Sequence, residues 1–102
     1  MILAQPSIPL ADLPFGTTKA LCLAGQSILL VNHEGTIHAI ANECSHAFQT
    51  LEGGRIMNGW IACPAHGARF DLATGEALGP PATSPIATYP VRVEDGMIHV
   101  DL

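Results

Sequence analysis

The stretch "NECSHAFQTLEGGRIMNGWIACPAHGARFD", residues 42–71, places two cysteines close to two histidines. Cys44 and His46 form a C-x-H pair, and Cys63 and His66 form a C-x-x-H pair. Thiolate and imidazole groups are both good ligands for transition metals. Spacings this short let one tight loop present two side chains to one site. The stretch therefore predicts a metal centre built from two loops.

Such a ligand set is compatible with more than one kind of site. Two cysteines and two histidines can hold one tetrahedral zinc ion, which would make the chain a zinc-stabilised binding module. The commonest zinc arrangement, however, pairs cysteine with cysteine and histidine with histidine, whereas each loop here supplies one of each. That arrangement suits a cluster of two metals, with both cysteines on one iron and both histidines on the other. An empty site and a Cys44–Cys63 disulfide are further alternatives.

The rest of the chain predicts an all-β fold. Its 102 residues have the length of a single domain, and 48% of them are hydrophobic, which suffices for one core. Short apolar runs alternate with turn sequences, and no long helical period is present. The runs expected to form strands lie at residues 19–24, 27–32, 36–41, 59–63, 87–94 and 97–102. We expect an antiparallel sandwich or barrel, with a hairpin turn at Asp95-Gly96.

Charge and hydropathy exclude several classes of function. The formal net charge is −5, whereas a nucleic-acid-binding protein needs a basic face. No apolar run approaches the roughly 18 residues of a membrane span, and the N-terminus has no positively charged leader. These features predict a soluble, cytoplasmic protein with no membrane or nucleic-acid partner. In a reducing compartment, clustered cysteine and histidine bind metal more often than cysteines form disulfides.

The two pairs resemble the motif of the Rieske iron–sulfur family. The resemblance extends to "LEGG" (51–54), "CPAHGARFD" (63–71), "TGE" (74–76) and "GPPATSPIATYPVRVEDGMIHV" (79–100). It implies the Rieske fold, an antiparallel β-sandwich with an inserted cluster-binding subdomain. The chain would then be one domain over residues 1–102, with the subdomain at approximately 42–85.

The resemblance also implies a cofactor, which is one Rieske-type 2Fe–2S cluster per chain. Cys44 and Cys63 would bind the buried iron, and His46 and His66 would bind the outer iron. Residues 79–82, "GPPA", would correspond to the family's proline-rich loop that shields the cluster.

Departures from the respiratory and photosynthetic Rieske proteins indicate a particular branch. Those proteins have a disulfide between the cluster loops, where this chain has Gln49 and Ala65. They also have serine and tyrosine hydroxyls that bond to cluster or cysteine sulfur, where this chain has Ala68 and Phe70. The chain resembles instead the low-potential Rieske ferredoxins of bacterial ring-hydroxylating dioxygenase systems.

That resemblance implies the partners. The chain would carry single electrons from an NAD(P)H-linked flavoprotein reductase to a terminal Rieske oxygenase that hydroxylates aromatic rings. It would not itself be an enzyme, because nothing in it supplies the 2-His-1-carboxylate iron site of the oxygenases. The alternative is a small Rieske subunit of a nitrite reductase. Such subunits often lack the ligands, and all four are present here.

The remaining residues receive simpler interpretations. Cys22 is expected to be a buried thiol that acts as a small hydrophobe. His33 is expected in a surface turn, and His38 and His99 on the solvent faces of strands. An apolar rim for partner docking is expected around the histidine ligands, formed by Ala47, Phe48, Pro64, Ala65 and Pro81.

Overall fold

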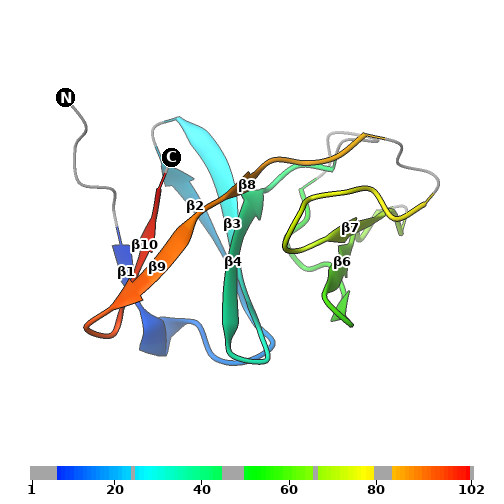
Figure 1. The fold of residues 1–102 in the computed structure, drawn as a ribbon. Helices are drawn as coiled ribbons and strands as arrows, with labels where there is room; N and C mark the ends of the chain where they lie inside the picture. The colour runs from blue at the N-terminus through cyan, green and yellow to red at the C-terminus, as the bar shows by residue number, and fades with distance from the viewer. Residues whose placement is uncertain (1–6, 24, 45–49, 66, 80–83, 102) are drawn as a thin grey trace.

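The computed structural model of the chain describes residues 7–23, 25–44, 50–65, 67–79 and 84–101. Strands in these ranges form three antiparallel sheets (Figure 1). The first sheet has the order β1-β10-β9, with β1 at Ser7–Pro9, β9 at Val91–Glu94 and β10 at Met97–Val100. A single 3₁₀ turn, η1, follows β1 at Leu10–Asp12. This confirms the prediction of an all-β chain.

The second sheet lies in the middle of the molecule and has the order β2-β3-β4-β8. Its strands are β2 at Thr18–Leu23, β3 at Gln26–His33, β4 at Thr36–Ala41 and β8 at Thr88–Tyr89. The third sheet is smaller, with the order β5-β6-β7. It comprises β5 at Ile56–Met57, β6 at Trp60–Ala62 and β7 at Arg69–Asp71, and is inserted between β4 and β8.

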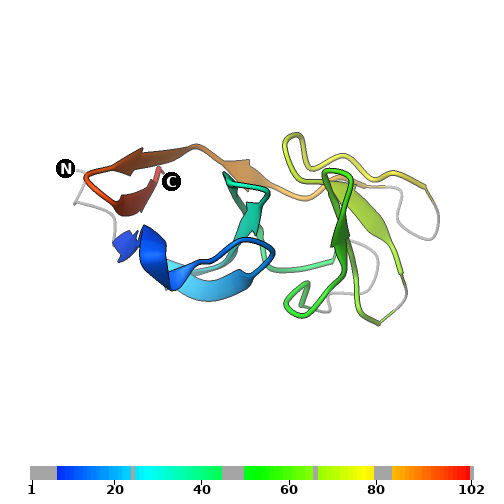
Figure 2. The same cartoon turned by 90° about the horizontal axis from the view of Figure 1, so that it is seen from below.

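The central sheet is covered on both faces, and this explains the uninterrupted apolar run of β3. Ile28 and Leu30 pack into one core with Ile98 and other residues of the first sheet. Leu29 and Val31 point the other way, into a second core that includes the third sheet. Because successive strand residues face opposite sides, a strand buried on both faces must be apolar throughout. Figure 2 shows the three sheets arranged in a row, with the central sheet between the first and the third.

Two hairpins have turns in which both central residues have positive φ. Asp95 and Gly96 join β9 to β10 with φ angles of 52° and 73°. Asn58 and Gly59 join β5 to β6 with φ angles of 51° and 83°. Positive φ at both central residues matches the right-handed twist of the paired strands, and Asn, Asp and Gly adopt it at least cost. The hairpin predicted at Asp95-Gly96 is therefore confirmed.

The run at 87–94 was expected to be one strand, but it forms two strands in different sheets. β8 pairs with β4, whereas β9 pairs with β10. Pro90 separates them, and having no N–H it cannot donate to a sheet ladder. Its carbonyl oxygen instead accepts a hydrogen bond from the N–H of Asp101 at 2.9 Å. Pro90 is therefore the point at which the chain crosses from one sheet to the next.

The prediction of a buried Cys22 is wrong, since this thiol is exposed. β2 is an edge strand of the central sheet, and only one of its faces packs on the core. The neighbouring Leu21 packs against that core, so Cys22 points the opposite way. The apolar run alone did not show which face of β2 would be covered.

In the described ranges, no helix is long and apolar enough to cross a membrane.

Candidate metal centre

The two cysteines of the predicted site lie in one hydrophobic core. Cys44 comes shortly after β4 and is 0% exposed, and Cys63 directly follows β6 and is 2% exposed. Both belong to the cluster that also contains Leu51, Ala68 and Phe70. Strands from two different sheets therefore bring the two thiols into the same water-free region.

The histidine half of the predicted site, His46 and His66, lies outside the described residues. So do Ala47, Phe48 and Gln49 on the first loop, and Pro81 on the segment after β7. Of the expected docking rim, the structure describes Pro64 and Ala65, and both are exposed. Among the described residues, no group of three or more metal-ligating side chains is present.

The loop that carries Cys63 is closed by hydrogen bonds at its base. The N–H of Cys63 donates to the carbonyl oxygen of Ala68 at 2.7 Å, and the N–H of Gly67 donates to the carbonyl oxygen of Cys63 at 2.8 Å. Gly67 has a φ of 75°, a conformation that side chains with a Cβ rarely adopt. The backbone of Cys63 is thus held in place while Pro64 and Ala65 remain at the surface.

The loop that carries Cys44 is closed by the side chain of Asn42, a role that sequence reasoning missed. Asn42 is 5% exposed, and its Oδ1 accepts hydrogen bonds from the N–H groups of Leu51 at 2.9 Å and Glu52 at 3.1 Å. One amide therefore joins the beginning of the loop to its end. The signal in the sequence was an asparagine two residues before Cys44, and asparagine is common in ordinary turns.

Replacing Asn42 with alanine should destabilise the protein. The buried N–H of Leu51 and that of Glu52 would lose their acceptor, at a cost of about 1–3 kcal/mol for an unsatisfied buried group. Each kcal/mol lowers the melting temperature by about 4–8 °C at this chain length. Thermal unfolding of the iron-loaded protein measures the effect. Asn42→Asp keeps the acceptor and should be milder, and Thr50→Ala, at an exposed position of the same loop, should be neutral.

Gly54 lets the end of the first loop lie directly against β6. A Cβ at this position would overlap the carbonyl oxygen of Ala62, the residue before Cys63. The N–H of Gly54 donates to the carbonyl oxygen of Leu51 at 2.9 Å, so the turn is held by its own backbone. The two cysteine loops are therefore in backbone contact, and any larger residue than glycine would force them apart.

The donors that the structure describes fit the cysteine half of a metal centre. Thiolates are the ligands that iron–sulfur clusters require, and here two thiols lie in a dry core at the bases of two adjoining loops. Cys63 forms no disulfide with a described residue, which argues against the Cys44–Cys63 alternative. The fully buried Ala68 and Phe70 add no hydroxyl to this core.

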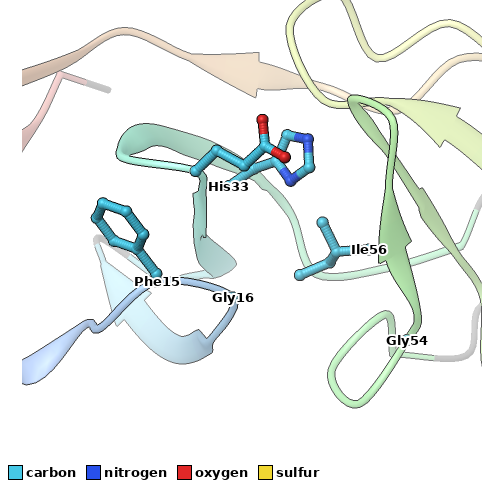
Figure 3. Close-up of a pocket in the computed structure, with 6 residues that line it drawn as sticks. Phe15, Gly16, His33, Gly54 and Ile56 are labelled. Carbon is cyan, nitrogen blue, oxygen red and sulfur yellow. The ribbon is translucent and has the colours of Figure 1, made fainter.

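A second feature lies where the central and third sheets meet. A groove of about 390 Å³ is lined by Phe15, Gly16, His33, Glu34, Gly54 and Ile56. Figure 3 shows how Phe15, His33 and Ile56 lie around it. The placement predicted for His33, in a surface turn, is wrong. It ends β3, and its Nε2 accepts a hydrogen bond from the N–H of Gly59 in the β5–β6 turn at 3.0 Å. His33 therefore joins the third sheet to the central one, so the groove marks this junction and includes neither cysteine.

His38 is half-buried in β4, where a solvent-facing position was expected, and its pKa is lowered. Burial is the main cause, because an imidazolium loses hydration there, and the charge of His33 adds to it. Asp71 acts in the opposite direction. The pKa of Asp71 is itself lowered, chiefly by the backbone N–H of Thr74, and also by that of Ala73.

These shifts predict that stability falls as the solution becomes acidic. As the pH falls, the unfolded chain binds a proton at His38 near the ordinary pKa of about 6.5, which is a higher pH than the folded protein requires. The contribution of His38 is therefore complete above about pH 6.5 and is lost as the pH falls toward the lower folded pKa. Asp71 stabilises the fold throughout this range, and its effect is lost only at a still lower pH, as the pH falls through its own lowered pKa. Melting temperatures of wild type and His38→Gln between pH 8 and 5.5 test this, and parallel curves would contradict it.

Comparisons with known proteins agree with this geometry. Residues 4–90 match the family model of the Rieske [2Fe–2S] domain. The 3-phenylpropionate/cinnamic acid dioxygenase ferredoxin subunit of Escherichia coli (strain K12) is 42% identical, over 92% of this chain and 89% of that protein. The ferredoxin component of the naphthalene 1,2-dioxygenase system of Pseudomonas putida is 35% identical, over 94% of this chain and 92% of that protein.

A solved structure has the same fold over nearly its whole length. The ferredoxin of carbazole 1,9a-dioxygenase from Nocardioides aromaticivorans IC177 superposes with a TM-score of 0.90 at 31% identity, covering 96% of this chain and 97% of that one. This confirms the fold expected from the sequence, and the matched family model confirms a Rieske-type 2Fe–2S cluster as the cofactor. With two adjoining loops whose cysteines are buried in one core, and a family model that matches residues 4–90, the chain belongs to the Rieske [2Fe–2S] domain family.

Proposed function

We propose that this chain is a low-potential Rieske ferredoxin that carries single electrons from an NAD(P)H-linked flavoprotein reductase to a terminal aromatic-ring-hydroxylating oxygenase. The observation that carries the proposal is the pair of buried cysteines, Cys44 and Cys63, in one core at two adjoining loops. Relatives that match nearly the whole chain are named as ferredoxin components of dioxygenase systems. The chain is thus an electron-transfer component, and the oxygenase carries out the hydroxylation.

Four ligands would hold the cluster in this proposal. Cys44 and Cys63 bind the buried iron, and His46 and His66 bind the outer iron. We infer one domain over residues 1–102, in which approximately 42–85 form the cluster-binding subdomain. A Rieske cluster supplies reversible one-electron reduction. The described residues contribute a dry environment around the thiols and fixed loop backbones, held by the hydrogen bonds of Cys63 and Asn42.

The residues around Cys63 support a low potential. Ala68 is hydrogen-bonded to Cys63 through its backbone, and both Ala68 and Phe70 are 0% exposed. Neither side chain can donate a hydroxyl hydrogen bond that would stabilise the added electron. We expect a potential near the low end of the Rieske range, at roughly −150 mV.

The surface near the second loop supports brief partner encounters. Pro64 and Ala65 are exposed beside the buried Cys63, so a partner that contacts them comes close to the cluster. The net charge of −5 favours association with a basic face on the reductase and the oxygenase. We place the protein in the cytoplasm, where a reducing environment keeps its thiols available as ligands.

The first test concerns the cofactor. Protein purified without oxygen should contain about two irons and two sulfides per chain and should take up one electron from dithionite. Its reduced form should show an EPR signal with an average g value below that of all-cysteine clusters. Stoichiometric zinc in place of iron would contradict the proposal and favour the zinc-stabilised module.

The second test concerns the electron path. With the reductase and oxygenase of the 3-phenylpropionate dioxygenase system, the iron-loaded chain should support NADH-driven hydroxylation, and Cys63→Ser should not. An intact cluster that accepts electrons from this reductase, but delivers none to the oxygenase, would contradict the proposed acceptor. Electron delivery to a nitrite reductase instead would favour the alternative subunit.

A further inference from the structure

The segment after β7 returns along that strand and is bound to it. The N–H of Asp71 donates to the carbonyl oxygen of Glu76 at 2.9 Å, and the N–H of Leu78 donates to the carbonyl oxygen of Arg69 at 2.9 Å. Between them, Phe70 and Ala77 form an antiparallel bridge. In Figure 1 this returning segment runs beside β7 at the edge of the third sheet. It covers the strand that leads out of the Cys63 loop.

Arg69 lies where the returning segment meets the base of the Cys63 loop. Its strand partner is Ala62, the residue directly before Cys63. The pairs Ala62–Arg69 and Trp60–Asp71 place Arg69 and Trp60 diagonally on one face of the β6–β7 hairpin. The guanidinium carbon of Arg69 lies 5.5 Å from the centroid of the Trp60 ring, which is a cation–π contact.

The guanidinium also lies near the end of the returning segment. A Cβ built on Gly79 would lie 3.9 Å from a terminal nitrogen of Arg69, at van der Waals distance. The Arg69 guanidinium is therefore close to both the Trp60 ring and Gly79. Its own carbonyl oxygen accepts the hydrogen bond from Leu78, so side chain and backbone hold the same segment.

Arg69 is held by an aromatic ring and not by a carboxylate. Over the described residues, the ion pairs are those of Arg92, with Glu94 at 3.0 Å and with Asp101 at 3.5 Å. The planar guanidinium can stack on a ring and pack against backbone at the same time, whereas the compact ammonium of lysine cannot. The local geometry thus depends on the shape of the arginine and not only on its charge.

We propose that Arg69, stacked on Trp60, is a positioning residue that holds segment 76–79 against the β6–β7 hairpin and so keeps water from the Cys63 side of the cluster. The inference rests on the proposed function, because it assumes that Cys63 is a cluster ligand. Reduction adds one negative charge, which water stabilises. Loosening the segment should therefore raise the potential and speed the loss of iron.

Arg69→Lys separates positioning from charge. It keeps the positive charge but removes the stacked plane, so the potential should rise and iron transfer to a chelator should become about two- to fivefold faster, as expected for loss of a surface cation–π contact. Trp60→Leu removes the ring and should have the same effects with arginine still present. Hydrogen exchange at the N–H of Leu78 should also be faster in both variants.

Two further variants make the test specific. Arg92→Lys is an equally conservative change in the first sheet and should leave the potential and the iron loss unchanged. The double variant Arg69→Lys/Trp60→Leu should have no larger effect than either single change, because both remove one contact. An intact cluster in Arg69→Lys with wild-type potential, iron loss and Leu78 exchange would overturn the positioning role. A wild-type protein without a 2Fe–2S cluster would instead overturn the proposed function.

Discussion

Replacing Cys63 with serine should abolish cluster assembly. The Cys63 thiol is 2% exposed in the same core as Cys44, and no other described cysteine lies in that core to replace it. A serine hydroxyl is a poor ligand for iron in a cluster, where a soft, deprotonated thiolate is needed. Iron and sulfide analysis should find neither above background, and the visible absorption of the cluster should be absent.

The same change should also lower the stability of the fold. A metal centre bound by side chains from two loops contributes its binding free energy directly to folding. Each kcal/mol lost lowers the melting temperature by about 4–8 °C at this length. Cys22→Ser is the matched control, because that thiol is exposed on β2, and it should retain full iron content. Normal iron content in Cys63→Ser would remove Cys63 from the ligand set.

The double change Ala68→Ser with Phe70→Tyr should raise the reduction potential by tens of millivolts. Both side chains are fully buried in the core that contains Cys44 and Cys63, so new hydroxyls would lie in the same dry region as the two cysteines. A hydroxyl that donates to sulfur stabilises the reduced form. A shift of about 59 mV changes a one-electron equilibrium tenfold, so the variant would pass electrons on less readily.

Protein-film voltammetry measures this shift, and the single variants show how much each hydroxyl contributes. Adding an atom to a packed core lowers the free energy of unfolding by about 1–3 kcal/mol. The melting temperature of each variant is therefore measured together with its potential. Ala39→Ser is the control, because Ala39 is equally buried but belongs to the other core, which contains neither Cys44 nor Cys63. An unchanged potential in the double variant, with the cluster intact, would show that missing hydroxyls are not the cause of a low potential.

Local sequence features predicted the strands and turns well. The run at 27–32 predicted a strand, and β3 covers it. Asp95-Gly96 predicted a hairpin, because this pair adopts positive φ at low cost. The break at Pro90 was missed, since a proline also occurs in edge strands. Its effect depended on β8 and β9 having partners in different sheets.

Two side-chain roles could not be read from the sequence. His33 accepts a hydrogen bond from Gly59, which lies 26 residues further along the chain. Asn42 accepts from Leu51, 9 residues away, across a loop whose path the sequence does not specify. In the sequence each looks like an ordinary polar residue near a turn. These two hydrogen bonds join residues that the fold brings together, so no local sequence pattern predicts them.

By itself the sequence predicted which kinds of side chain would bind the cofactor, because ligand type and short spacing are local properties. C-x-H and C-x-x-H place the thiols of Cys44 and Cys63 on two separate loops, whatever surrounds them. Only the tertiary structure decided that both thiols share one dry core, with Ala68 and Phe70 buried around them. It does so because the central sheet is covered on both faces, and apolar side chains of the third sheet exclude water from the face that the cysteines share.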